Sequence, residues 1–410
     1  MKMWMAALCL AFMAAAMPSS LLATNPEFET GARLWDFRDT NRVAVPETTM
    51  IDGAMLPDGS MAVLAMGDEW RGSLGLYRLA PNGDFRSRQE FEGWIWWNDE
   101  QPNPAIVPIV GESVGFIVVG SHMGYARLPL EVPPLQTVAW VEAPFVMATS
   151  VSASLNGSVW IGGTENERSH SGPRCSRAVI ARYGGNDKWR WQWVFEDQAE
   201  AMFVRRIIPL ADGAILAHVS SNSPVGYGGG SIRLPCDEKM GHDWLVWVSA
   251  DGRTLREVGL GHDSIEAMAV LSDGTIALAD FTREVSRTRD LRLRLLSADG
   301  ARTLIVRRYP ASHERGDNRR VDATGWPRGW TVSTVENLRL LPDGFALAVS
   351  IDHEDGRRGP IHLLRLDQNM DPLALSAAWP GETSFLMGIA VDSDEYVVGG
   401  SAGVYRLKLP

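Results

Sequence analysis

The chain has 410 residues, of which 45% are hydrophobic and 22% are charged. These proportions exclude extended disorder and allow a sizeable buried core. Lysine and arginine together number 39 against 50 aspartates and glutamates. The formal net charge of −11 therefore argues against a nucleic-acid partner, and against a protein that charge holds to anionic lipid.

The N-terminus carries an apolar run over residues 3–17, which follows Lys2 and ends at Pro18. This length is short for a bilayer span but typical of a secretory signal peptide. We predict a signal peptide over residues 1–23, with residues 14–16 as an alternative cleavage site, and an exported protein, periplasmic or extracellular. Glycine, proline or charge interrupts each later apolar run within about ten residues, so no membrane span is predicted.

A Leu-x-Asp-Gly turn recurs between pairs of apolar runs. Asp-Gly and Asn-Gly turns supply the positive φ of tight hairpins, so each copy predicts strand, turn, strand. A second hairpin follows each first one, as at residues 76–83, which gives four antiparallel strands per unit. The turns are anchored at Gly59, Gly213, Gly274 and Gly344, with weaker copies at Gly115, Gly157 and Asp394.

Four-stranded units that repeat roughly four to eight times form a β-propeller. The seven anchors predict one all-β domain over residues 24–410, a seven-bladed β-propeller of four-stranded antiparallel blades. The last unit lacks a fourth strand, and residues 32–37 precede the first inner strand. We therefore expect the N-terminal strand to complete the last blade and close the ring.

These Pro-Asp-Gly and related turns make residues 32–410 resemble secreted bacterial β-propellers with degenerate blade repeats, of the delta-60-repeat kind. The resemblance implies the propeller fold. Propellers of this kind include binding modules, scaffolds and enzymes, so the resemblance transfers no catalytic residue to this chain.

The long connections all fall on one face of the predicted ring, at residues 93–104, 164–176, 220–242 and 310–333. Long loops on a rigid scaffold usually carry binding. Cys175 and Cys236, the two cysteines outside the signal peptide, lie in neighbouring loops of this face. They predict a disulfide in an oxidising compartment, with two free thiols as the alternative.

Aromatic residues are frequent in these loops. Exposed aromatic rings stack on sugars or on peptide side chains, whereas inward packing over the loop cores is the alternative. The candidate ligand-binding residues in the loops are Trp94, Trp96, Trp97, Tyr227, Trp326 and Trp330.

The predicted inner strands carry polar residues at equivalent distances from the anchors. Charged side chains there cost several kcal/mol if they are dry and unpaired, so we expect them to be paired or in water around the axial opening. His218, on the next strand, either joins them or is a satisfied core histidine. The inner-strand candidates are Arg205, Arg206, Glu266, Glu336 and Asn337.

Other motifs do not predict a metal or a cofactor. The tripeptides at residues 241–243 and 261–263 both read Gly-His-Asp, but their spacing matches no known ligand motif, and polar loops are the preferred interpretation. Acidic clusters at 352–355 and 392–395 lack the spacing of a calcium loop. No phosphate-binding glycine loop or dinucleotide motif is present in the right context.

The sequence therefore predicts an exported, non-catalytic binding module that recognises a carbohydrate or peptide on its long-loop face. The alternative is a propeller hydrolase or lyase with an axial site. In that alternative Glu266 and Glu336 act as acid and base, and Arg205 stabilises negative charge.

Overall fold

The computed structural model describes 28 β-strands and the turns between many of them, and no helix occurs among these residues. The described residues are 32–35, 47–56, 58–67, 74–91, 105–109, 115–119, 124–129, 141–142, 147–153, 158–166, 176–184, 188–195, 202–221, 242–261, 264–281, 289–311, 331–352, 361–375, 384–389, 395–400 and 403–408.

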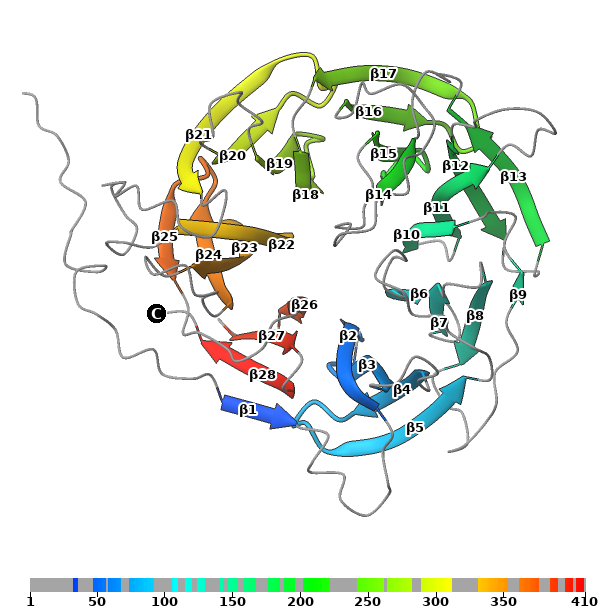
Figure 1. The fold of residues 1–410 in the computed structure, drawn as a ribbon, viewed down its shortest axis with the longest axis vertical. Coiled ribbons are helices and arrows are strands. Elements are labelled where there is room, and N and C mark those ends of the chain that lie inside the picture. Colours follow the sequence, from blue (N-terminus) through cyan, green and yellow to red (C-terminus); the bar gives the residue numbers. More distant parts are fainter. Residues whose placement is uncertain are drawn as a thin grey trace, which may run out of the picture.

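The protein is an all-β propeller whose blades are four-stranded antiparallel sheets (Figure 1). Three blades come from the first part of the chain: β2 (Glu47–Met55), β3 (Met61–Gly67), β4 (Leu74–Leu79) and β5 (Phe85–Phe91); β6 (Ala105–Ile109), β7 (Gly115–Val119), β8 (Gly124–Pro129) and β9 (Val141–Glu142); and β10 (Met147–Ala153), β11 (Val159–Asn166), β12 (Ser176–Gly184) and β13 (Lys188–Val194).

A fourth blade follows directly, and a fifth closes the ring. The fourth contains β14 (Phe203–Pro209), β15 (Ile215–Ser220), β16 (Asp243–Val248) and β17 (Thr254–Gly261). The fifth contains β26 (Ser384–Ile389), β27 (Glu395–Gly400), β28 (Gly403–Lys408) and the N-terminal strand β1 (Ala32–Trp35). As expected, β1 pairs antiparallel with β28, with Ala32 opposite Arg406.

The expectation of seven separate four-stranded blades is wrong. The structure has five such blades and one continuous eight-stranded sheet. A parallel bridge between Ala311 and Val332 joins β21 to β22, so two hairpin pairs share one sheet. The strands of this sheet are β18 (Ser264–Val270), β19 (Ile276–Phe281), β20 (Arg289–Leu296), β21 (Thr303–Ala311), β22 (Thr331–Leu341), β23 (Gly344–Asp352), β24 (Ile361–Asp367) and β25 (Pro372–Leu375).

The Asp-Gly turns adopt the predicted hairpin geometry. Gly213 has a φ of 83° and Gly274 a φ of 85°, values that a glycine adopts without steric cost. The aspartate before each glycine accepts a hydrogen bond from the main-chain N–H two residues later, at 3.0 Å for Asp212 and 2.9 Å for Asp273. These turns are therefore fixed by the local sequence.

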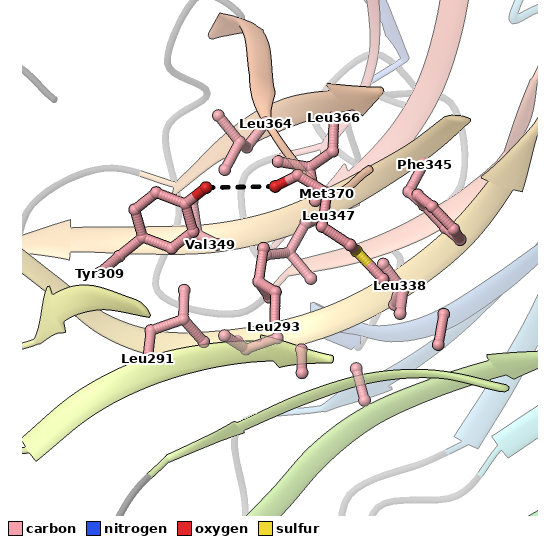
Figure 2. Packing of buried hydrophobic residues seen from close by; sticks show 14 of the residues in the cluster. Leu291, Leu293, Tyr309, Leu338, Phe345, Leu347, Val349, Leu364, Leu366 and Met370 are labelled. Carbon is pink, nitrogen blue, oxygen red and sulfur yellow. Dashed lines mark hydrogen bonds between the residues drawn. The ribbon is translucent and has the colours of Figure 1, made fainter. Parts of the chain in front are cut away.

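Apolar side chains fill the interfaces between successive sheets. One cluster joins the β10–β13 blade to the β14–β17 blade, and another joins the β14–β17 blade to β18–β20. A third, drawn in Figure 2, lies between the β18–β21 and β22–β25 halves of the eight-stranded sheet. Side chains alternate along each strand, so both faces of a blade contribute to the core.

Outer strands also contact the turn of the following unit. Arg182 of β12 donates to the carbonyl of Ala250 at 2.7 Å, and Arg256 of β17 lies 3.1 Å from the carboxylate of Asp299. Arg307 of β21 binds Asp371 with two hydrogen bonds, of 2.5 and 2.8 Å. These polar contacts hold neighbouring units together at the rim of the ring.

Candidate functional site

Most innermost strands share a structural irregularity that sequence counting locates almost correctly. Among the described pairs of first and second strands, all except β6 with β7 have a register shift where one residue is extra. A β-bulge of this kind bends a strand and re-aims a side chain. The extra residues are Ile51, Thr149, Arg205, Glu266, Glu336 and Met387, and β2 and β22 each have a second one, Thr48 and Ser333.

Three of the predicted residues lie where β14 and β18 approach each other. These two strands approach each other along a shorter stretch than β10 and β14 or β18 and β22 do. Arg205, Arg206 and Glu266 are all half-buried there. The Arg206 guanidinium donates a hydrogen bond to the main-chain carbonyl of Glu266, and so connects the two innermost strands.

The carboxylate of Glu266 has its own partner on the same strand. It accepts a hydrogen bond of 2.7 Å from the hydroxyl of Ser264. This contact orients the carboxylate of Glu266, while Arg206 binds the main-chain carbonyl of the same residue. We call the region of Arg205, Arg206, Ser264 and Glu266 the β14–β18 junction.

Directly behind the junction lies a buried histidine–aspartate pair. Nε2 of His218 is 2.7 Å from Oδ1 of Asp243, and the two side chains are 0% and 1% exposed. His218 is opposite Arg206 across β14 and β15, and Asp243 is the first residue of β16. The sequence indicated His218, but it placed Asp243 in a polar loop, whereas the structure buries Asp243 at the start of β16. Their contact depends on strand pairing.

The surroundings keep His218 neutral. Burial lowers the pKa of its imidazole, and the charges of Arg205 and Arg206 lower it further, while the hydrogen bond and charge of Asp243 oppose this. In the neutral form Nε2–H donates to Asp243 and Nδ1 is an acceptor. Because the ring has no contact with solvent, it does not reach a substrate as a general base.

A second group of charged side chains lies elsewhere around the axis. Asn337 of β22 is half-buried, and Arg339, two residues later on the same face, is exposed. The surrounding protein nevertheless lowers the pKa of Arg339, and the carboxylate of Asp52 on β2 opposes this. Sequence counting missed Arg339, although its period-two relation to Asn337 indicates it.

Several predicted site residues lie outside what the structure describes. Only the main chain of Glu336 is described, at its bulge in β22. The loop aromatics and both cysteines fall outside the described residues: Trp94, Trp96, Trp97, Tyr227, Trp326, Trp330, Cys175 and Cys236.

The part of the chain that the structure describes contains no group of three or more His, Cys, Asp or Glu side chains arranged to hold a metal ion. Within that part there is also no helix of the length and apolarity needed to cross a membrane. The polar side chains described near the axis carry guanidinium, carboxylate, amide and hydroxyl groups.

Comparison with known proteins supports the fold. No protein-family model matches the chain, and no curated protein matches it. A solved structure described as the Dos1 propeller is 9% identical and matches with a TM-score of 0.51, over 91% of this chain and 81% of that chain. A protein of unknown function from Bacteroides caccae is 16% identical with a TM-score of 0.33, over 54% of this chain and 72% of that one. The first likeness shows the propeller fold alone.

Proposed function

We propose that the protein is an exported, non-catalytic binding module whose carbohydrate or peptide partner contacts the β14–β18 junction. The observation that carries this proposal is the contact of Arg206 with the main chain of Glu266 across two innermost strands. Arg205, Arg206 and Glu266 are half-buried on these two strands. Preorganised polar groups of this kind bind hydroxyl, amide or carboxylate groups of a ligand without a large ordering cost.

The long loops supply the rest of the proposed surface. Innermost strand β14 and its neighbour β15 place Arg205 and His218 toward the end of the blade that carries the connection between β15 and β16. We propose that aromatic residues of the loops at this end, including Trp96, Trp97 and Trp330, stack on the ligand beside the polar junction.

A hydrolase or lyase with Glu266 and Glu336 as acid and base is the alternative. It has less support, because Ser264 already binds the Glu266 carboxylate and the nearby His218 is sealed from solvent. Arg205 remains the group that would stabilise negative charge in that reaction. Conversion of a bound ligand would favour the alternative over the binding module.

The test is a glycan-array and peptide-array screen of the purified protein, followed by affinity measurements on variants. We expect Arg205→Ala and Glu266→Gln each to weaken binding by roughly tenfold or more, as for central contacts of an interface. Arg253→Ala is the matched control, since Arg253 lies in an outer turn with a side chain that is 82% exposed. Unchanged affinity in both junction variants would place the site elsewhere.

The loop contribution is tested in the same assay. We expect Trp96→Ala, Trp97→Ala and Trp330→Ala each to weaken the ligand interaction, because stacking contacts are lost. If all three variants bind like the parent protein, the long-loop face is not the binding face. Glu336→Gln tests the enzyme alternative, in which it abolishes turnover.

Export and the disulfide are also part of the proposal. We propose that residues 1–23 are removed on secretion and that Cys175 is joined to Cys236 in the mature protein. N-terminal sequencing of the secreted protein and peptide mapping without reductant test these two statements. An uncleaved N-terminus, or two free thiols after secretion, would contradict them.

A further inference from the structure

The histidine–aspartate pair lies inside the interface between two neighbouring sheets. Leu216, two residues before His218, packs with Ile265 and Leu278 of the eight-stranded sheet. Because side chains alternate along a strand, His218 faces the same interface. The same reasoning places Asp243 beside Leu245 on this face. A titratable pair is thus enclosed in the contact that holds the β14–β18 junction.

Charged side chains lie on the elements packed against His218, and Arg205 and Arg206 are the positive charges that act on it. Asp280 is already bound by two arginines, with Nε of Arg292 and of Arg294 each at 2.7 Å. Among the described side chains, four arginines and four carboxylates lie on the strands of this interface. These groups are Arg205 and Arg206 on β14, Asp243 on β16, Glu266 on β18, Asp280 on β19, and Asp290, Arg292 and Arg294 on β20.

Protonation of His218 would also add a buried donor. Nε2 is already engaged with Asp243, so the added proton would reside on Nδ1. Among the residues that the structure describes, Nδ1 of His218 has no hydrogen-bond partner. A buried N–H group without an acceptor is costly, and the charges of Arg205 and Arg206 increase that cost.

We propose that the His218–Asp243 pair positions Arg206 and makes the β14–β18 junction loosen as the pH falls. Arg206 lies directly opposite His218, and its guanidinium reaches the main chain of Glu266. When the sheets separate at this interface, His218 meets water and accepts a proton, and Arg206 loses its position. Acidification therefore weakens the site, and the consequence for ligand binding rests on the proposed function.

Linkage between protonation of His218 and opening of the junction determines whether acidification stabilises or destabilises the junction. In water a histidine has a pKa of about 6.5, and the pKa of His218 in the closed structure lies below its ordinary value. Between these two pKa values the open form binds more protons than the closed form. The closed junction is therefore most stable above about pH 6.5, and it loses stability as the pH falls toward the pKa of the closed form.

Hydrogen–deuterium exchange of the full protein at pH 7.5 and 5.5 tests this without any ligand. After correction for intrinsic exchange, we expect peptides covering residues 203–209 and 264–270 to exchange up to about tenfold faster at pH 5.5, because a histidine in water with a pKa of about 6.5 is about tenfold more protonated than neutral at that pH. His218→Gln retains a donor for Asp243 but does not titrate, so it should remove the pH response. Asp243→Asn should enlarge it, because the carboxylate is the group that opposes the low pKa of His218.

His362→Gln is the matched control, because His362 is also fully buried but lies on β24. It should keep the parental pH response at the junction. The inference is overturned if exchange of the parent protein at the junction does not change between the two pH values, or if His218→Gln keeps the change. Because this readout needs no ligand, it can succeed when the proposed binding function fails, and the reverse also holds.

Discussion

The hydroxyl of Tyr309 on β21 donates a hydrogen bond of 3.1 Å to the main-chain carbonyl of Met370, in the turn between β24 and β25 (Figure 2). Met370 has a φ of 65°, and among the described residues it is the one non-glycine with positive φ. The corresponding turns of the two preceding units have glycine, Gly252 and Gly300. The buried Met370 side chain, packed in the cluster with Tyr309, offsets this backbone cost.

Replacement of Met370 by glycine tests whether side-chain packing outweighs the cost of the positive φ. Loss of a fully buried methionine side chain costs about 2–5 kcal/mol, whereas relief of the left-handed conformation returns about 1–2 kcal/mol. We expect Met370→Gly to lower the free energy of unfolding by about 1–3 kcal/mol in urea denaturation. Tyr309→Phe removes only the hydrogen bond and should cost about 1 kcal/mol. An unchanged or more stable Met370→Gly protein would contradict the packing explanation.

Two glycines distinguish backbone strain from close packing. Gly261 has a φ of 82°, and a Cβ added there would meet no atom within 4 Å. Gly300 has a φ of 68°, but its Cβ would lie 2.8 Å from the ring of Trp247 in the neighbouring blade. We expect Gly261→Ala to cost about 1 kcal/mol and Gly300→Ala about 2–4 kcal/mol of unfolding free energy. Equal costs would show that Trp247 moves aside freely.

Asp299 and Asp251, each in a turn between the third and fourth strands of a unit, have lowered pKa values chiefly because of a neighbouring serine. The hydroxyl of Ser297, the N–H of Ala301 and Arg256 together lower the pKa of Asp299 to about 2. We expect Ser297→Ala to raise this pKa toward its ordinary value, since the serine is the largest cause. A carboxyl-carbon NMR titration measures it, and Ser249→Ala should raise the pKa of Asp251 in the same way.

These low aspartate pKa values also determine the pH range in which the turn contacts stop stabilising the folded state. A carboxylate whose pKa is lowered by folding stabilises the folded state above its ordinary pKa, near 3.9, and that contribution is lost as the pH falls toward 2. Stability of the parent protein should therefore decline from about pH 4 downward. The decline should be smaller in Ser297→Ala. An equal decline in both proteins would contradict the assignment.

The Arg307–Asp371 pair joins the two halves of the eight-stranded sheet, and its side chains are 37% and 30% exposed. A double-mutant cycle with alanine at each position should give a coupling of about 0.5–1 kcal/mol, because the contact is bidentate but partly solvated. The Arg253–Asp251 pair is the control, since both side chains are largely exposed and we expect no measurable coupling there. Equal coupling in the two pairs would show that burial and geometry do not determine the coupling free energy of these ion pairs.

Much of the fold is predictable because its information is local. The aspartate and glycine of each Leu-x-Asp-Gly turn fix a hairpin, and alternation along the strands fixes the buried faces. The pairing of β1 with β28 is also predictable from the incomplete last unit. The bridge between Ala311 and Val332 was not predicted, because it joins strands whose ends are set by packing and not by a turn motif.

The positions of the polar site residues can be predicted from the sequence, but the contacts between these residues cannot. Counting from the turns located the bulge residues Arg205 and Glu266, because each bulge lies at a nearly constant distance from its turn. The partner of Arg206, a main-chain carbonyl on the next sheet, has no sequence pattern. The same is true of Ser264, which binds Glu266 within one strand but was not singled out.

The amino-acid sequence by itself determined most of the strands, their turns and the positions of the bulges at Arg205 and Glu266, because these depend on contacts within one hairpin. The tertiary structure decided that His218 meets Asp243 behind Arg206, and that the two halves of the eight-stranded sheet merge. Such contacts depend on how far apart neighbouring sheets lie and on how their side chains interdigitate. That is a property of the closed ring and not of any one unit.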